Sequence, residues 1–284
     1  MKMKKWMGKM VSMMLVTGMA IGLAGCGSTS GTAAGNSAAD ATEVSTQSGD
    51  KLILGTSADY PPFEFIVLNE DGKQEYAGLD ISLAEQLAKD MGKELEVVNM
   101  SFENLMTALQ KGEVDMVIAA IEDNEERSKV ADFSDSYYSD YPPKVLIKKD
   151  MLDTYTSLDS FSGKIVGAQI GTTKADIVTE KMTGATLTSL SSVTDLINNL
   201  EYDKCDAVVL DGAVAEKYAS ENDDMAVADV EVGDISNYAI AVQKGDPKNL
   251  LDSFNKTIKN AVDEGLIDKW SEESNSDSDQ AVSN

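Results

Sequence analysis

Histidine is absent from this chain of 284 residues. Its absence excludes the commonest general base, Ser-His-Asp and Cys-His catalysis, and histidine-ligated zinc. Cysteine occurs only twice, as Cys26 and Cys205, and two thiols cannot hold a metal cluster. Their different sequence settings argue against a disulfide. We therefore expect no metal and no cofactor, with Cys205 filling the protein core rather than acting as a nucleophile.

Positive charge is also scarce, with 24 lysines and arginines against 49 acidic residues. A surface of that charge repels nucleic acids and anionic membranes, which excludes nucleic-acid binding. Apolar residues make up 42% of the chain, enough for one large domain or two medium ones.

The first 25 residues have the pattern of a secretory signal peptide: four lysines, then an apolar run over 10–25. That run is too short for a membrane span of roughly 20 residues. The sequence LAGC, ending at Cys26, resembles the bacterial lipobox, which implies lipidation of that cysteine and anchoring at the outer face of the cell membrane. The alternative is a plain signal peptide with a chance cysteine.

Residues 26–49 are rich in Gly, Ser, Thr and Ala and contain little to bury. Such a segment cannot offset its own ordering entropy, so we expect a flexible, lipid-anchored linker. Residues 272–284 are polar and acidic, and we expect a disordered tail there for the same reason. The folded part should therefore span about residues 50–271.

Apolar periodicity predicts strands that alternate with helices, which is typical of an α/β fold with largely parallel sheets. The first set is predicted as strands 51–57, 94–100 and 115–121 and helices 78–92 and 101–112. The second set is predicted as strands 164–170, 185–190 and 206–211 and helices 171–182, 191–204 and 212–220.

The repeated plan predicts two lobes. Lobe 1 should comprise 50–140 plus 240–271, and lobe 2 should comprise 141–239. The chain should cross between them at 141–149 and 236–247, and the last helix should pack back on lobe 1. Because ligands bind beyond the carboxyl ends of strands in open α/β sheets, two facing lobes predict a shared cleft.

Five motifs then occur in a familiar order: SADYPPFEF, GLDISLAEQLAKDMG, VDMVIAA with ER and ADFSDSYY, GAQIGTT, and CDAVVLDGAVAEKY. Together they resemble the extracellular solute-binding proteins of polar amino-acid ABC importers, across essentially all of residues 50–271. The resemblance implies a two-lobed periplasmic-binding-protein type II fold, each lobe a mostly parallel sheet flanked by helices, joined by two hinge strands.

The resemblance implies roles for three residues of lobe 1. Tyr60, before the proline pair, would pack on the ligand, or else be a turn aromatic on the lobe surface. Phe102 would be a second aromatic wall or a core residue. Arg127 would hold the ligand's carboxylate, because a guanidinium offers a planar, two-pronged donor. Its alternative is a solvated arginine paired with a neighbour such as Asp123.

In lobe 2, Gly171, Thr172 and Thr173 open a helix, where free backbone N–H groups and the dipole favour an anion. Asp211 matches the family aspartate that takes the ligand's ammonium, and it also suits the N-cap of the next helix. Gln169 stands where relatives place a side chain that helps to set specificity.

The segment AAIEDNEER, residues 119–127, is unusually acidic. Asp123 and Glu126 fit a capping box, in which acids suit the positive end of a helix. Ala119 and Ala120 should border the cleft, and they lack the hydroxyls that some relatives use there.

Glu122 departs from the family pattern, which places a carboxylate-binding hydroxyl at this position. A desolvated glutamate would repel a ligand carboxylate by roughly several kcal/mol. Glu122 could face solvent, pair with Arg127, or bind a cationic part of the ligand. With Glu64 and Asp211 nearby, the last case would favour basic amino acids or other amines.

The function predicted is the substrate-binding component of an ABC importer, which captures an amino acid or related small amine and delivers it to a membrane permease. We expect a monomer that is not an enzyme. The alternative is a dehydratase-like enzyme on the same fold, in which burial would raise the pKa of Glu122 and make it a general acid or base.

Overall fold

The structure is a computed structural model that describes residues 51–69 and 71–281. The predicted signal peptide, the linker and Cys26 lie outside the described residues. None of the described helices is both long and apolar enough to cross a membrane.

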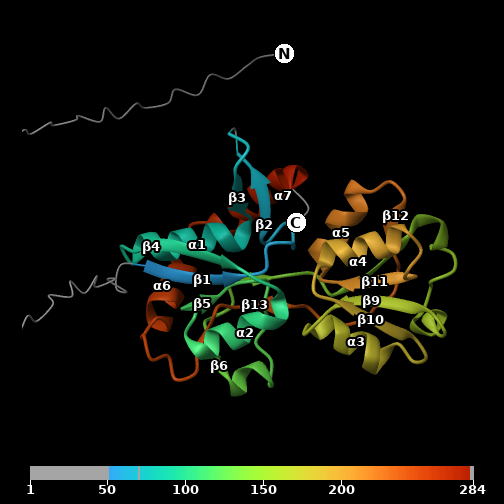
Figure 1. Cartoon of the computed structure of the whole chain (residues 1–284), viewed down its shortest axis with the longest axis horizontal. Coiled ribbons are helices and arrows are strands. Elements are labelled where there is room, and N and C mark those ends of the chain that lie inside the picture. Colours follow the sequence, from blue (N-terminus) through green and yellow to red (C-terminus); the bar gives the residue numbers. More distant parts are fainter. Residues whose placement is uncertain (1–50, 70, 282–284) are drawn as a thin grey trace, which may run out of the picture. The chain divides into compact units, whose positions relative to one another are not determined.

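Two five-stranded sheets organise the chain, and each is flanked by helices (Figure 1). The first has the order β4-β1-β5-β14-β6, formed by Glu94–Asn99, Lys51–Thr56, Met116–Val117, Ala241–Gln243 and Ala131–Phe133. The second has the order β10-β9-β11-β8-β12, formed by Thr186–Leu190, Ile165–Gln169, Ala207–Leu210, Lys144–Lys148 and Met225–Val227. The α/β class predicted from the sequence is confirmed, and we call each sheet with its helices a lobe.

Both sheets are mixed, because one strand in each runs against its neighbours. In the first sheet this strand is β14, and in the second it is β8. Each follows a crossing between the lobes, where β7 (Tyr138–Ser139) pairs with β13 (Asn237–Tyr238). The crossings lie at the edge of each sheet where the parallel strands end. A strand that begins at a crossing therefore starts at that edge and runs in the opposite direction to the parallel strands.

Helices cover both faces of each sheet. The first lobe has α1 (Leu79–Asp90), α2 (Phe102–Lys111), α6 (Leu251–Asp263) and α7 (Leu266–Asp277). The second has α3 (Thr173–Lys181), α4 (Val193–Glu201) and α5 (Gly212–Glu221). Short 3-10 helices lie at Arg127–Lys129, Lys149–Met151, Leu158–Phe161 and Ser278–Gln280, and a hairpin joins β2 (Phe65–Leu68) to β3 (Gln74–Ala77).

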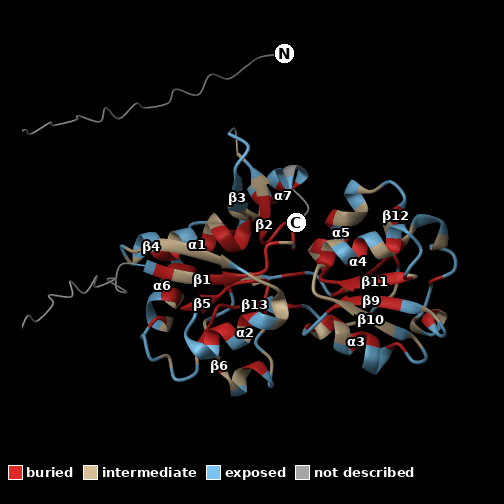
Figure 2. Ribbon diagram, in the orientation of Figure 1, coloured by how far each residue is buried: buried red, intermediate tan, exposed pale blue. Residues whose placement is uncertain are grey.

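The strand sequences explain why both faces are covered. Successive side chains of a strand point to opposite faces. In β8, Val145 and Ile147 pack in a cluster with α3, whereas Leu146 packs in a cluster with α4 and α5. β9 and β11 are apolar on both faces and largely buried (Figure 2). Continuous apolar runs of this kind are typical of a sheet between two helical layers.

One predicted strand is much shorter than the sequence suggests. The apolar run 115–121 forms a strand only over β5, Met116–Val117. The chain then turns at Ala120, whose φ is +44°, and whose N–H donates to the Asp80 carboxylate at 2.7 Å. This hydrogen bond replaces a strand ladder contact with a contact to α1, so the run ends as a loop at the carboxyl end of the sheet.

The C-terminal segment also differs from the predicted disordered tail. Helix α7 continues to Asp277, and residue Ala281 bridges to Val67 of the β2–β3 hairpin. Lys217 of α5 donates to the Asn275 carbonyl at 2.9 Å and to Asp279 at 2.5 Å. These contacts with α5 and the hairpin give the polar segment partners that its own composition does not supply.

Candidate functional site

The candidate site is built from segments that follow strands at their carboxyl ends. Ser57–Glu64 follows β1, Phe102 opens the helix after β4, and Ala119–Arg127 follows β5 in lobe 1. In lobe 2, Thr172 precedes α3 and Asp211 directly follows β11. This is the position at which open α/β sheets bind ligands.

These segments enclose a small cavity with residues from both lobes. Its lining comprises Ser57, Tyr60, Glu64, Phe102, Ala119, Ala120, Gln169, Thr172, Lys174 and Asp211. The cavity volume is about 10 Å³, roughly the space that one water molecule requires. An amino acid therefore enters only if side chains move or the lobes separate.

The predicted binding residues fall into two groups in the structure. Eight line the cavity, and four lie beside it in an ion-pair network: Glu122, Arg127, Gly171 and Thr173. Their role in binding a ligand stays a prediction.

Glu122 lies at the centre of that network. Arg127 donates from Nη1 to the Glu122 carbonyl at 2.9 Å and to its carboxylate at 3.3 Å. The Thr173 hydroxyl donates to the same carboxylate at 3.0 Å, and so does the Ser236 hydroxyl at 3.0 Å. Of the alternatives that the sequence left open, the structure contains the pairing with Arg127.

Lys174 also lies in this site, and the sequence motifs did not predict it. It is only 4% exposed, yet it carries a charge. Its ammonium lies 3.1 Å from Glu122 and 2.7 Å from Asp211, so it joins carboxylates of the two lobes. One signal existed in the sequence: a lysine in the first turn of a helix faces the positive end of the dipole and needs a compensating anion.

The charges of this network control the pKa of Glu122. Burial is the largest single effect and would raise the pKa, but the charges of Lys174 and Arg127 and the hydrogen bonds from Lys174 and Ser236 together outweigh it and lower the pKa to about 2. Glu122 is therefore ionised at neutral pH. A general acid or base of the kind considered for a dehydratase needs a raised pKa, so the structure does not favour that role.

Asp211 is at the N-cap position of α5, but its side chain makes no capping hydrogen bond. It accepts from Lys174 instead, and the Tyr60 hydroxyl donates to it at 2.8 Å. Tyr60 is thus buried between the lobes, rather than lying on a lobe surface. Through Lys174 and Glu122, Asp211 is connected to Arg127.

Glu64 is buried at 1% exposure, and its Oε2 has no hydrogen-bond partner in the described part of the chain. Burial raises its pKa well above the usual value, and the neighbouring Asp80 adds to the rise. Asp80 is itself buried, which raises its pKa to about 6 although the Ala120 N–H and the Tyr137 hydroxyl oppose the shift. Burial and the neighbouring carboxyl both favour the neutral form of Glu64.

The loop before α3 is held by its own hydrogen bonds. Gly171 has a φ of +78°, which favours glycine, and its carbonyl accepts from Arg127 Nη2 at 3.2 Å. The Thr172 hydroxyl donates to the Gln169 carbonyl at 2.8 Å, and the Gln169 amide donates to the Ser191 carbonyl at 2.9 Å.

The remaining expectations for this region have mixed outcomes. The Arg127 guanidinium lies over the Phe102 ring at 5.4 Å, a cation–π contact, while Phe102 also packs against the core beneath α2. The predicted capping box is wrong, because the Asn124 side chain, and not Asp123, accepts from the N–H groups of Glu126 and Arg127. Cys205 is a buried free thiol at 4% exposure, as the core interpretation predicted.

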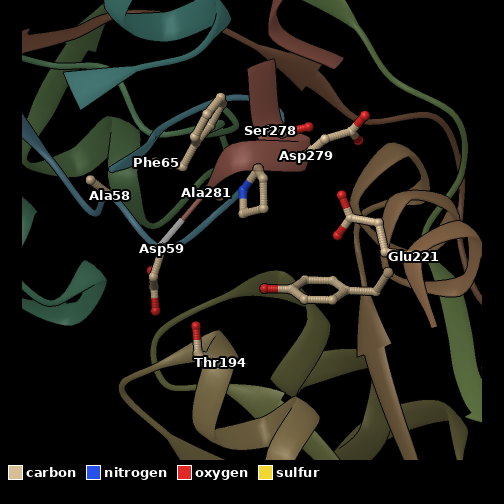
Figure 3. A pocket seen from close by; sticks show the side chains of 10 residues that line it. Ala58, Asp59, Phe65, Thr194, Glu221, Ser278, Asp279 and Ala281 are labelled. Carbon is tan, nitrogen blue, oxygen red and sulfur yellow. The ribbon is translucent and has the colours of Figure 1, made fainter. Parts of the chain in front are cut away.

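A larger hollow of about 410 Å³ lies elsewhere (Figure 3). Its lining comprises Ala58, Asp59, Pro61, Phe65, Thr194, Tyr218, Glu221, Ser278, Asp279 and Ala281, none of them a predicted site residue. Its three carboxylates already have partners: Asp59 accepts from the Val193 N–H, and Glu221 and Asp279 pair with Lys217. It therefore offers a ligand less than the smaller cavity does.

Two α/β lobes with a shared polar site between them define a binding protein of the two-lobed class. Residues 52–274 match the bacterial extracellular solute-binding proteins, family 3. The chain belongs to this family, and it is a solute-binding protein rather than an enzyme.

Known relatives agree with this assignment. The chain is 36% identical over 224 residues to the arginine-binding extracellular protein ArtP of Bacillus subtilis, covering 77% of this chain and 84% of that one. It is 31% identical to the ABC transporter arginine-binding protein 1 of Escherichia coli, covering 79% and 90%. The crystal structure of the amino acid ABC transporter substrate-binding protein AbpA from Streptococcus pneumoniae, bound to L-arginine, superposes with a TM-score of 0.76 at 34% identity, covering 80% and 95%.

Proposed function

We propose that this protein is the amino-acid-binding component of an ABC importer and that it captures a cationic solute, either a basic amino acid or a related amine. The solute binds in the cleft between the lobes and passes to a membrane permease. Family membership supports the transport role, and the arginine-binding relatives support the positive charge of the solute.

The observation that carries the cationic preference is the buried Oε2 of Glu64. Among the described residues this atom has no hydrogen-bond partner, and Glu64 lines the cavity together with Asp211. Buried polar atoms are almost always hydrogen-bonded, so an atom of this kind in a cavity wall is a position for a ligand donor. A guanidinium or ammonium supplies that donor and the opposite charge.

The proposal extends to where the protein works. We infer that residues 1–25 are removed, that Cys26 carries the lipid, and that residues 26–49 tether the two lobes. Labelled palmitate should enter the wild-type protein and not the Cys26→Ser variant, which should appear in the medium. Equal labelling of the two would contradict the anchor.

A thermal-shift screen with L-arginine, L-lysine, agmatine and L-citrulline tests the ligand class. Citrulline is the matched control, because it has nearly the shape of arginine without the side-chain charge. A ligand at about one hundred times its Kd adds about 2.7 kcal/mol to the free energy of unfolding. The cationic solutes should raise Tm and citrulline should not. Stabilisation by citrulline equal to that by arginine would overturn the cationic preference.

A further inference from the structure

Glu122 and Lys174 have a consequence for the choice of ligand. We propose that their side chains occupy the positions in which the carboxylate and the ammonium of a zwitterionic ligand would bind, so that the cleft favours cations without a carboxylate. This inference rests on the proposed function and narrows its ligand class.

The position for a carboxylate is filled by the Glu122 side chain. Arg127 is the guanidinium of this site, only 8% exposed, and it donates to the Glu122 carboxylate at 3.3 Å. The hydroxyls of Thr173 and Ser236 donate to the same carboxylate, each at 3.0 Å. A ligand carboxylate would need these donors, one guanidinium and two hydroxyls. The Glu122 carboxylate already accepts hydrogen bonds from all three.

The position for an ammonium is filled by Lys174. Its Nζ donates to Asp211 at 2.8 Å and to Glu122 at 3.1 Å. Asp211 also accepts from the Tyr60 hydroxyl at 2.8 Å and from Ser236 at 3.3 Å. A second ammonium therefore finds the oxygens of Asp211 engaged, and it binds there only by displacing Lys174.

The network is balanced in charge, with the buried cations Lys174 and Arg127, the buried Asp211 carboxylate and the Glu122 carboxylate, whose side chain is 13% exposed. A zwitterion that enters this network must break internal ion pairs to replace them with pairs of the same kind, so it gains little. A cation at Glu64 breaks none of them, because the Oε2 of Glu64 has no hydrogen-bond partner in residues 51–69 and 71–281. The two ligand classes thus differ in cost: an amino acid must displace internal ion pairs of the network, whereas a cation without a carboxylate need not.

The lining of the cavity, rather than its volume, bears on this separation, because about 10 Å³ admits neither arginine nor agmatine until side chains or lobes move. Lys174 and Asp211 form part of the wall of a space of about 10 Å³. Their ion pair fills the volume that the charged end of an amino acid would need, and Glu64 remains in the lining with Phe102 and Ser57.

Calorimetric titration of the purified protein with L-arginine and with agmatine, which is arginine without its carboxylate, tests the inference. The Glu122→Thr/Lys174→Gln variant removes the internal pair and restores a hydroxyl beside Arg127. The matched control is Glu216→Thr/Lys144→Gln, which removes a Glu–Lys pair outside the cavity lining.

We expect the wild type to bind agmatine at least as tightly as arginine. In the cleft variant, the ratio of the arginine Kd to the agmatine Kd should fall at least tenfold, and in the control it should change less than twofold. A tenfold preference of the wild type for arginine overturns the inference without any variant. If the cleft variant folds and its ratio of the arginine Kd to the agmatine Kd equals that of the wild type, the inference is also overturned. Neither of these two results contradicts the proposal that the protein binds cationic solutes. Failure of every cationic solute to bind the wild type overturns the proposed function as well.

Discussion

Removal of the Lys174 charge should destabilise the protein more than any change to a surface ion pair. The ammonium is 2.7 Å from Asp211 and 3.1 Å from Glu122, and all three side chains are at most 13% exposed. In Lys174→Gln, two carboxylates stay buried while one of their cations is gone. Breaking a buried pair from one side costs about 3–5 kcal/mol, because it leaves an uncompensated charge.

The pKa of Glu122 shows in which pH range the whole network stabilises the folded protein. Lys174 and Arg127 together lower it from 4.5 to about 2, against the effect of burial. That difference corresponds to about 3 kcal/mol, at 1.36 kcal/mol for each pH unit. Because the pKa is lower in the folded state, this stability is present above about pH 4.5 and is lost as the pH falls through about 2. The broken buried pair sets the expected loss for Lys174→Gln at about 3 kcal/mol at pH 7, or roughly 6–12 °C in Tm.

Urea unfolding at pH 7 of the wild type, Lys174→Gln, Glu122→Gln and the double variant measures this effect. The double variant should cost about 2 kcal/mol less than the sum of the single variants, since removing both partners leaves fewer unpaired charges. Lys144→Gln and Glu216→Gln form the control cycle, and a pair as exposed as this one should show a coupling below about 1 kcal/mol. Additive losses in the cleft cycle would refute the reasoning.

Three further predictions concern the same region. In the Glu122→Thr/Lys174→Gln background, in which Arg127 is released from Glu122, Arg127→Ala should weaken a carboxylate-bearing ligand at least tenfold and leave agmatine nearly unchanged in calorimetric titration; equal losses would contradict an anion grip. Because the pKa of Glu64 is raised, binding of a cation should release a proton from it, and the affinity for the cation should rise with pH. Glu64→Gln should abolish the proton release. A binding enthalpy that is the same in buffers of different ionisation enthalpy would contradict this. The pKa of Asp80 is raised to about 6 in the folded state, so its ionisation should lower the free energy of unfolding as the pH rises from about 4 to 6. In urea unfolding across that range, Asp80→Asn should show a smaller fall in this free energy than the wild type. An equal fall would contradict the prediction.

The periodicity of apolar residues predicted the position of most helices and strands. Periodicity placed the helix at 78–92, which the structure has at Leu79–Asp90, and the strand at 94–100, found at Glu94–Asn99. It was insufficient at 115–121, where a strand of two residues remains. The apolar run there predicts a strand, but the Asp80 carboxylate, about forty residues earlier in the chain, takes the Ala120 N–H. A competing hydrogen bond over that separation leaves no local signal.

The site was predictable to the extent that it depends on strand ends. The sequence places Arg127 and Asp211 after strands of different lobes, and parallel strands end at a common edge, so a link between them was expected. The sequence did not predict that an ion pair through Lys174 and Glu122 would connect these two residues. Lys174 follows the predicted Gly-Thr-Thr loop immediately, yet its burial depends on Glu122 and Asp211, which lie on other segments.

Glu122 and Lys174 are understandable only together. Glu122 alone would place a third acid beside Glu64 and Asp211, and the repulsion would fall on a buried site where charges are poorly screened. Lys174 alone would set a cation beside Arg127 and at the positive end of α3. Each substitution without the other is therefore unfavourable, whereas both together return the cleft to neutrality. It follows that reversing both of them, as in Glu122→Thr/Lys174→Gln, should destabilise the protein by less than the sum of the two single changes, because the double change leaves fewer unpaired charges.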